Sequence, residues 1–168
     1  MRCVIDTSAL SWMGRIKMLD LLPRLYDQIY APPAVLDELI PHRETKKFEA
    51  THLIPIRFES LEQLIEFNQI VQETMAQVGS SDLADVEVAV AHKYYVHTDE
   101  ALYANKDAEN RLANYGPIRD IANLFELAEA KGIYTRKRSI KFLRKFLKKE
   151  HEYRTPYVES LLKRIMDS

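Results

Sequence analysis

Short apolar runs alternate with amphipathic helical segments along most of this chain, and this alternation is the strongest constraint on its fold. Residues 2–6 form a β-branched run that ends in a carboxylate, residues 28–31 form a second run, and residues 94–98 form a third. Short, continuously apolar runs are typical of strands that are buried on both faces. Strands that alternate with helices favour a parallel sheet covered on both sides. The pattern therefore predicts a three-layer α/β/α sandwich with a central parallel sheet.

Helix signals fill the spaces between these runs. Pro33 suits the first turn of a short helix over residues 34–40, and Ser60 is a helix cap for a long apolar-periodic segment over 61–77. Further helices are expected over residues 9–13, 18–26, 82–91, 107–113 and 120–131, with an additional strand near 52–57. The same α/β pattern thus continues as far as Gly132, which follows the last of these helices.

The remaining residues have a different composition. Residues 1–130 carry 12 Lys and Arg against 21 Asp and Glu, a balance of −9, whereas residues 131–168 carry 12 against 4, a balance of +8. We therefore divide the chain into a domain over 1–132 and a C-terminal basic helical extension over 133–168. Residues 136–149 predict an amphipathic helix, and residues 156–166 predict a second helix. The basic arc of the first helix comprises Lys137, Lys141, Arg144, Lys145 and Lys148.

The charge of this extension limits its partners. A basic segment on an acidic body suggests a polyanion such as RNA, whose phosphates these cations would contact, or an acidic protein. It is equally consistent with an extension that docks on its own acidic body.

Composition also excludes several classes of protein. The single cysteine, Cys3, cannot form an internal disulfide or a thiolate zinc site. The N-terminus lacks a signal-peptide pattern, and no apolar run approaches the roughly 20 residues that span a bilayer. We therefore expect a cytoplasmic protein that does not enter a membrane. The absence of a glycine-rich phosphate loop argues against a nucleotide-cofactor enzyme.

Four carboxylates occupy positions where a parallel sheet collects its functional groups. Asp6 and Asp99 each follow a predicted strand, Asp82 begins the helix that leads into the 94–98 run, and Glu38 lies on the helix after the 28–31 run. Because the carboxyl ends of parallel strands meet at one edge, we expect all four to face one crevice. Carboxylate oxygens are the ligands that Mg²⁺ and Mn²⁺ prefer, and such an ion can activate water against a phosphodiester. The four acids therefore predict a divalent metal site.

Each acid also has a structural interpretation, so alternatives remain open. Asp82 could serve only as a helix cap, and Asp85 is the alternative to it. Asp6 could be a cap at the end of its strand, and Asp99 could be an ordinary turn acid. Glu38, on a short helix, would by itself be a solvated surface residue.

Several segments resemble the motifs of PIN-domain proteins. Residues 4–10 (VIDTSAL) resemble the opening strand and turn, and residues 32–39 (PPAVLDEL) resemble the second motif with its glutamate. Residues 81–91, followed by 96–99, resemble the third and fourth motifs. Residues 15–22 and 129–133 are similar to a group of predicted nucleic-acid-binding PIN proteins that is related to the VapC toxins of toxin–antitoxin pairs.

The resemblance implies a function and a set of residues. It implies a Mg²⁺- or Mn²⁺-dependent ribonuclease, often a homodimer, in which Asp6, Glu38, Asp82 and Asp99 bind metal and catalyse cleavage. Ser8 matches a small polar position that contacts a phosphate. A toxin role would add an acidic antitoxin as partner. The sequence departs from the pattern between Asp99 and Arg111, where it is longer than its relatives, so Asp107 is an alternative to Asp99 for the fourth acid. It also lacks the glycine-threonine turn of many relatives near Ile118. A non-catalytic PIN module that binds nucleic acid or protein is the second hypothesis.

Overall fold

Five parallel strands form the centre of the molecule. The computed structural model describes residues 1–39, 51–80, 82–149 and 156–168. The strands follow the order β3-β2-β1-β4-β5, so the first strand of the chain lies in the middle of the sheet. Their bounds are β1 Arg2–Ile5, β2 Gln28–Ala31, β3 Leu53–Pro55, β4 Glu100–Leu102 and β5 Ile118–Arg119. The three apolar residues of β1 after Arg2 are buried because the central strand has neighbours on both sides and helices on both faces.

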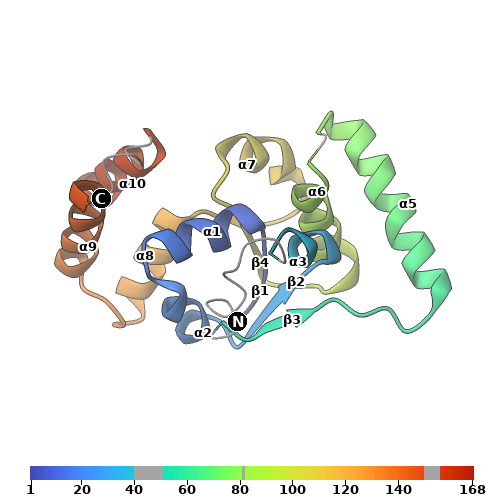
Figure 1. Ribbon diagram of the computed structural model, residues 1–168, viewed down its shortest axis with the longest axis horizontal. Coiled ribbons are helices and arrows are strands. Elements are labelled where there is room, and N and C mark those ends of the chain that lie inside the picture. Colours follow the sequence, from blue (N-terminus) through green and yellow to red (C-terminus); the bar gives the residue numbers. More distant parts are fainter. Residues whose placement is uncertain (40–50, 81, 150–155) are drawn as a thin grey trace.

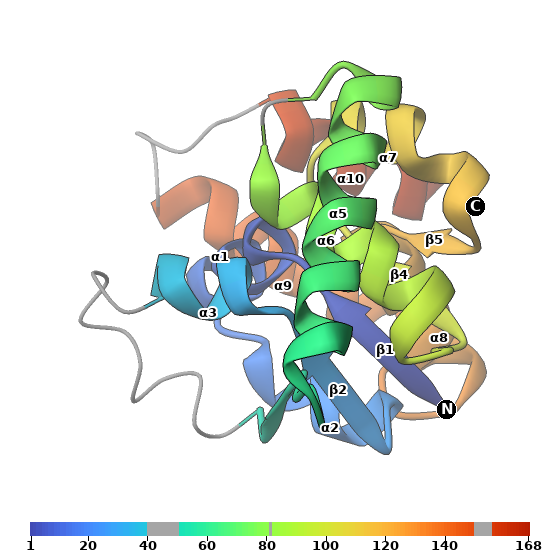
Figure 2. The same ribbon diagram turned by 90° about the vertical axis from the view of Figure 1, so that its right-hand side faces the viewer.

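Helices cover both faces of this sheet, which confirms the predicted α/β/α sandwich (Figure 1). In that view α5 and α6 lie on one side of the strands, and α8, α9 and α10 lie on the other. Turning the molecule brings α5 and α6 in front of β1 and β2 (Figure 2). The longer helices are α1 Thr7–Arg15, α5 Leu61–Val78, α6 Leu83–Val90, α8 Ile121–Ala130, α9 Arg136–Lys149 and α10 Pro156–Asp167. The shorter ones are η1 Leu19–Leu21, α2 Leu22–Leu25, α3 Pro33–Leu39, η2 Ala91–Tyr95, α7 Lys106–Leu112 and η3 Ala113–Tyr115.

Side-chain caps fix where the principal helices begin. Asp6 caps α1, Ser60 caps α5, Asp82 caps α6, and Asp120 caps α8 by accepting hydrogen bonds from backbone N–H groups of the first turn. Three of these four caps are acids that follow a strand or precede a buried helix. The caps therefore also determine where negative charge gathers. The expected end of α3 at Ile40 lies outside the described residues.

The predicted strand over residues 94–98 is wrong. Ala91–Tyr95 form a π-helical turn that continues α6, and the strand begins only at Glu100. The ring of Tyr95 packs on Phe58 and Phe67, with centroids 5.9 Å and 5.0 Å away. These aromatic side chains therefore serve helix packing, although their β propensity suggested a strand. The two-residue strand β5 was likewise not predicted.

The C-terminal helices form as predicted. Helix α9 presents Lys137, Lys141 and Arg144 to solvent and buries Leu143, which confirms its amphipathic character. Helix α10 buries Val158, Leu161 and Ile165, and both helices pack against α8. Among the described residues, no helix is long and apolar enough to cross a membrane.

Candidate active site

Asp6 is the central acid of the carboxyl edge of the sheet. It follows β1 directly, and its side chain is only 2% exposed. Its Oδ2 atom accepts hydrogen bonds from the backbone N–H of Ser8, at 3.0 Å, and from the Ser8 hydroxyl. Its Oδ1 atom is buried and has no amide or hydroxyl donor among the described residues, so the neighbouring carboxyl group of Asp85 is its only polar partner. An ionised carboxylate oxygen with no donor is costly to bury, so this atom is available for a cation or a proton.

Asp85 supplies the second buried acid. It lies in the first turn of α6, is 5% exposed, and interacts with Asp6. Burial, followed by the charges of Asp6 and Asp82, raises the pKa of Asp85 to about 8. Burial also raises the pKa of Asp6, with the Ser8 hydrogen bonds acting in the opposite direction. Two carboxyl groups placed this way resist simultaneous ionisation unless a cation lies near them.

Two contacts attach this acid pair to the next strand, β4. The Ser8 hydroxyl accepts a hydrogen bond from the backbone N–H of Ala104 at 3.0 Å, just past the end of β4. The Tyr103 hydroxyl donates to the backbone carbonyl of Asp85 at 2.8 Å. Tyr103 is itself fully buried. The ends of β1 and β4 and the start of α6 are thus joined around the two acids. The hydroxyl proton of Ser8 is already committed to Asp6, so a phosphate contact by Ser8, as the resemblance implied, remains only a prediction.

Asp82 and Glu38 lie at the rim of the same cluster. Asp82 is exposed and accepts hydrogen bonds from the backbone N–H groups of Ala84 and Asp85, so its role as a helix cap is confirmed. Its charge raises the pKa of both Asp6 and Asp85. Glu38 is also exposed, and its charge adds to the rise in the pKa of Asp85. The structure therefore gathers three of the four predicted acids around Asp85.

Glu87 fixes the helix that carries Glu38. Its buried carboxylate accepts a hydrogen bond from the backbone N–H of Ala34 at 2.7 Å, in the first turn of α3. The contact holds α3 against α6, since Glu87 and Asp85 belong to the same helix. The packing of α3 on α6 therefore sets the separation between the Glu38 and Asp85 backbones.

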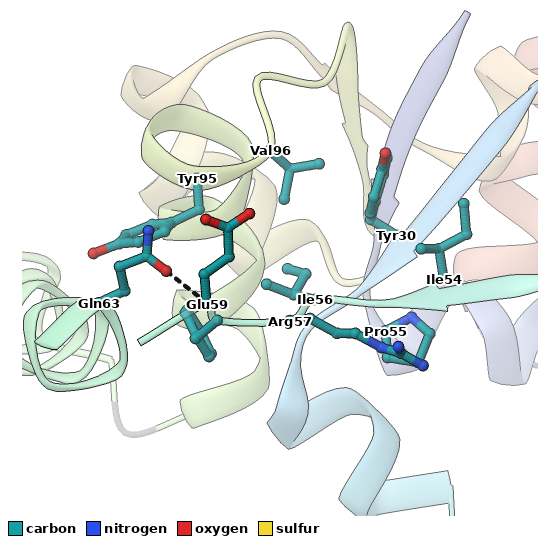
Figure 3. Close-up of a pocket in the computed structure, with 10 residues that line it drawn as sticks. Tyr30, Ile54, Pro55, Ile56, Arg57, Glu59, Gln63, Tyr95 and Val96 are labelled. Atoms are coloured by element: carbon teal, nitrogen blue, oxygen red, sulfur yellow. Dashed lines mark hydrogen bonds between the residues drawn. The ribbon is translucent and has the colours of Figure 1, made fainter. Parts of the chain in front are cut away.

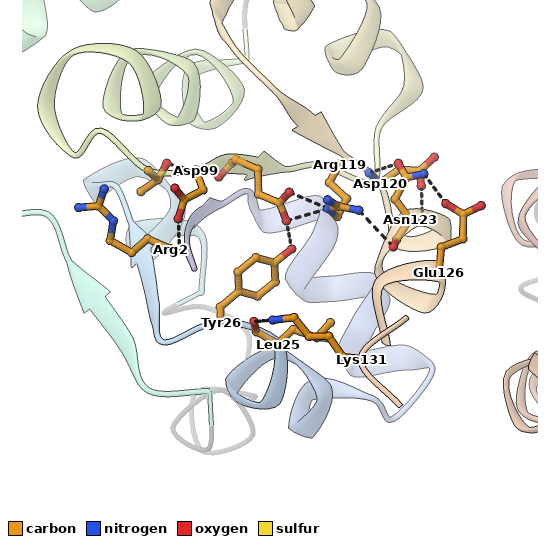
Figure 4. A network of polar contacts seen from close by, with 11 residues as sticks. Arg2, Leu25, Tyr26, Asp99, Arg119, Asp120, Asn123, Glu126 and Lys131 are labelled. Atoms are coloured by element: carbon orange, nitrogen blue, oxygen red, sulfur yellow. Dashed lines mark hydrogen bonds and ion pairs between the residues drawn. The ribbon is translucent and has the colours of Figure 1, made fainter. Parts of the chain in front are cut away.

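Asp99 lies at the opposite edge of the sheet, so its predicted position beside Asp6 is wrong. Its carboxylate accepts a hydrogen bond from the backbone N–H of Arg2 at 2.6 Å, at the amino end of β1, where Figure 4 shows the two residues together. The cause is the misplaced strand: Asp99 precedes β4 instead of following it. Its neighbour Glu100 enters a separate buried network with Tyr26 and Arg119.

Nearly the whole chain matches a family of known proteins. A family model described as a PIN domain matches residues 2–165. The chain belongs to the PIN-domain family. PIN domains are nuclease-type modules, so the acid cluster at the carboxyl edge is the candidate active site of this PIN domain. No curated protein matches the chain.

The residues after β4 take the place that the sequence assigned to Asp99. Asn105 caps α7 by accepting a hydrogen bond from the backbone N–H of Asp107 at 3.0 Å, and both residues belong to the carboxyl edge of this PIN domain. Sequence reasoning named Asp107 as an alternative but missed Asn105, because the strand was placed six residues too early. The correct end of β4 would have indicated it.

Asp120 is a further acid at this edge, following β5. It is buried and forms an ion pair with Arg164 from α10. The nearby Glu109 has its pKa raised to about 7, first by burial and then by the charge of Asp120. Sequence analysis treated Asp120 only as a helix start. Since Arg164 neutralises it, Asp120 is not part of the open acid cluster.

The carboxylate oxygens of the cluster are suitable ligands for a divalent cation, but the arrangement of the acids is not yet that of a complete metal site. Asp6 and Asp85 provide hard carboxylate oxygens, one of them without an amide or hydroxyl donor among the described residues. Within the described ranges, no three His, Cys, Asp or Glu side chains lie close enough to hold a metal ion as they stand. An ion at this site would be held by the buried pair, with waters or the exposed acids Asp82 and Glu38 completing its coordination shell.

Proposed function

We propose that this PIN domain is a metal-dependent endoribonuclease that hydrolyses RNA phosphodiester bonds with Mg²⁺ or Mn²⁺. The observation that carries the proposal is the buried pair of acids, Asp6 and Asp85, in which the Oδ1 atom of Asp6 has no donor other than the carboxyl group of Asp85. A purely structural aspartate at a strand end would have both oxygens hydrogen-bonded or solvated. A pair of acids kept in this arrangement is a cost to the fold that a bound cation removes.

The proposed ligands differ in how directly they would contact the ion. Asp6 and Asp85 would hold the ion, and Asp82 and Glu38 would complete its surroundings from the rim. One of the polar residues after β4, Asp107 or Asn105, replaces Asp99 in this set. A bound Mg²⁺ or Mn²⁺ would supply an activated water and offset the charge of the phosphodiester.

The protein itself orients these groups. Ser8 holds Asp6 through two hydrogen bonds, so the carboxylate cannot rotate freely. Tyr103 holds the first turn of α6, and Glu87 holds the start of α3. The RNA backbone would be attracted by the exposed basic arc of α9, which makes binding sensitive to salt. The proposed phosphate contacts are Lys137, Lys141, Arg144, Lys145 and Lys148.

The test is Mn²⁺-dependent cleavage of unstructured RNA by the purified chain. We expect Asp6→Asn and Asp85→Asn each to reduce cleavage at least about 100-fold while the circular dichroism spectrum is unchanged. Asp99→Asn is the matched control because Asp99 lies at the opposite edge, and it should retain activity. Wild-type cleavage by Asp85→Asn would refute the assignment.

A non-catalytic PIN module is the second candidate, favoured because no three His, Cys, Asp or Glu side chains among the described residues are grouped as a metal site needs. Titration calorimetry with Mn²⁺ separates the two. The nuclease should bind Mn²⁺ in a manner that Asp85→Asn abolishes, whereas an inert module should show no such binding.

A toxin role would be a more specific version of the same nuclease proposal. The balance of +8 over residues 131–168 supports an acidic protein partner such as an antitoxin. Induced expression of the wild-type chain should then arrest growth of a bacterial host, and Asp85→Asn should not. Normal growth with cleavage intact in vitro would leave the nuclease but remove the toxin role.

A further inference from the structure

Arg164 of α10 places a positive charge at the carboxyl edge of the sheet, outside the acid cluster. It forms an ion pair with Asp120, which directly follows β5. Asp6 follows β1, and β4 lies between these two strands. Because neighbouring strands are about 4.8 Å apart, the ends of β1 and β5 are about 10 Å apart. An RNA strand that follows this edge from Asp6 toward β5 therefore reaches Arg164.

The two members of this ion pair differ in exposure. The side chain of Asp120 is 8% exposed, whereas that of Arg164 is 46% exposed. Asp120 uses both of its oxygens, since Oδ1 accepts a hydrogen bond from the backbone N–H of Asn123 at 2.9 Å and Oδ2 pairs with Arg164. In the part of the chain that the structure describes, Asp120 is the only hydrogen-bond partner of the Arg164 guanidinium. The pair therefore holds the guanidinium at the edge and leaves several of its N–H donors open to solvent.

The basic surface of α9 reaches α10 at the level of Arg164. The two helices pack against each other, and Arg144 of α9 donates a hydrogen bond to the Sδ atom of Met166 at 3.5 Å. Met166 follows Arg164 by two residues, which is a rise of about 3 Å along the helix. Arg144 and Arg164 thus lie at the same level of α10, one toward α9 and the other toward Asp120. An RNA strand that crosses the last turns of α10 would contact both.

The α5 side of the molecule offers less positive charge to RNA. Helix α5 contains no Lys, Arg or His. A hollow of about 620 Å³ lies between the end of β3 and the start of α5 (Figure 3), and its charged lining consists of Arg57 and Glu59. These opposite charges balance, so the hollow does not attract a polyanion. The route for phosphates toward the acid cluster is therefore along α9 and α10.

We propose that Arg164, held at the edge by Asp120, binds a phosphate of the RNA strand on the β5 side of the acid pair. A planar guanidinium suits this role, because it can donate two parallel hydrogen bonds to one phosphate. The proposal rests on the nuclease function proposed above, since it adds a substrate contact at the same edge. The C-terminal extension would then bind RNA through α10 as well as through the basic arc of α9.

The experiment measures the affinity of the full chain for a labelled, unstructured RNA oligonucleotide by fluorescence anisotropy. A chelator is present, so that no RNA is cleaved. Arg164→Gln should weaken binding about 10-fold and reduce the slope of log affinity against log salt concentration by about 0.7. Arg164→Lys keeps the charge but loses the planar fork, so its affinity should be intermediate.

Lys163→Gln is the matched control. It removes an exposed charge from the neighbouring position of the same helix, where no contact with Asp120 holds the side chain at the edge. It should therefore weaken binding less than about 2-fold.

A double variant separates phosphate binding from a purely structural ion pair. Arg164→Gln alone leaves the buried Asp120 without its cation, which destabilises the fold whether or not RNA binds. Asp120→Asn with Arg164→Gln removes both charges and keeps a residue that caps helices well. We expect this double variant to regain the urea midpoint of the wild type but to keep the weak RNA binding of Arg164→Gln.

Each result bears on the proposal. Wild-type affinity in Arg164→Gln, recovered affinity in the double variant, or a wild-type chain that does not bind RNA would overturn it. Failure of the nuclease function has a different signature. A chain that does not cleave RNA with Mn²⁺, but whose RNA affinity still falls in Arg164→Gln and in the double variant, would retain the phosphate contact and lose the nuclease assignment.

Discussion

Replacing Asp85 by asparagine should stabilise the metal-free protein in alkaline solution. The carboxyl group of Asp85 has a pKa of about 8 in the fold, against an ordinary value of 3.8. Between about pH 4 and pH 8, the folded state therefore keeps a proton on Asp85 that the unfolded state has already released. Stability contributed by this proton is present at low pH and is lost as the pH rises through about 8. Asparagine cannot ionise, and its amide can donate to the Oδ1 atom of Asp6.

The expected size follows from the pKa difference. A pKa rise of about 4 corresponds to a change of at most about 6 kcal/mol in the free energy of unfolding, because each pKa unit is worth about 1.36 kcal/mol. Asp6 shares the same repulsion, and side-chain relaxation and water entry reduce the penalty of buried charges. We therefore expect Asp85→Asn to raise the free energy of unfolding by about 2–3 kcal/mol at pH 9 and to have almost no effect at pH 4.

Urea unfolding at pH 4, 7 and 9 in the presence of a chelator measures this difference. Comparing variant with wild type at each pH cancels the titration of other groups. Asp82→Asn is the matched control: asparagine also caps helices well, and Asp82 is exposed, so the gain should stay below about 1 kcal/mol. A stability difference for Asp85→Asn that does not change with pH, or a loss at pH 9, would refute the proposed repulsion.

Three further predictions concern other parts of the fold. Burial lowers the pKa of His92, so below about pH 6.5 the unfolded state binds more protons than the folded state, and stability should fall as the pH drops. His92→Gln should reduce this acid sensitivity in urea unfolding. Gly116→Ala should destabilise by about 2 kcal/mol or more, because its Cβ would lie 2.2 Å from Nε2 of His92 and its φ of 140° suits glycine; an unchanged thermal midpoint would contradict this. Glu87→Gln keeps an acceptor for the Ala34 N–H, so stability should change little, whereas Glu87→Ala should cost about 1–3 kcal/mol in urea unfolding because it removes that acceptor.

The sequence predicted the first half of the fold well because local and tertiary preferences agree there. Strand β2, helix α3 and the cap at Ser60 lie where propensity, proline and hydroxyl signals place them. The tail helices were predicted for the same reason, since the apolar arc of α9 is the arc that packs on the body.

In the second half of the chain, the prediction was wrong where tertiary contacts override local propensity. Residues 94–96 have high β propensity, yet Tyr95 packs on Phe58 and Phe67 from a helical turn. The true strand, β4, contains Glu100, which is buried only because Tyr26 and Arg119 satisfy it. Neither partner is adjacent in sequence, so no local signal indicated a buried strand with a glutamate.

This single misplaced strand explains the outcome for the site. Asp6 and Asp82 were placed correctly because their strand and helix were, and Asp99 was misplaced because it was attached to the wrong strand end. The sequence favoured Asp82 over Asp85 by position and resemblance, whereas the structure buries Asp85 and exposes Asp82, a difference set by how α6 packs on its neighbouring helices.

The two carboxylate oxygens of Asp6 have different roles, since one is hydrogen-bonded within the protein and the other is left for a ligand. Ser8 supplies both donors for Oδ2, so the fold provides one half of a solvation shell and leaves the other half open. An acid held in this way can coordinate through one oxygen only. Ca²⁺ commonly takes both oxygens of a carboxylate at longer distances, whereas Mg²⁺ keeps a compact octahedral shell and retains several waters. In the proposed metal site, the Ser8 hydroxyl would therefore favour Mg²⁺ over Ca²⁺ without contacting either ion.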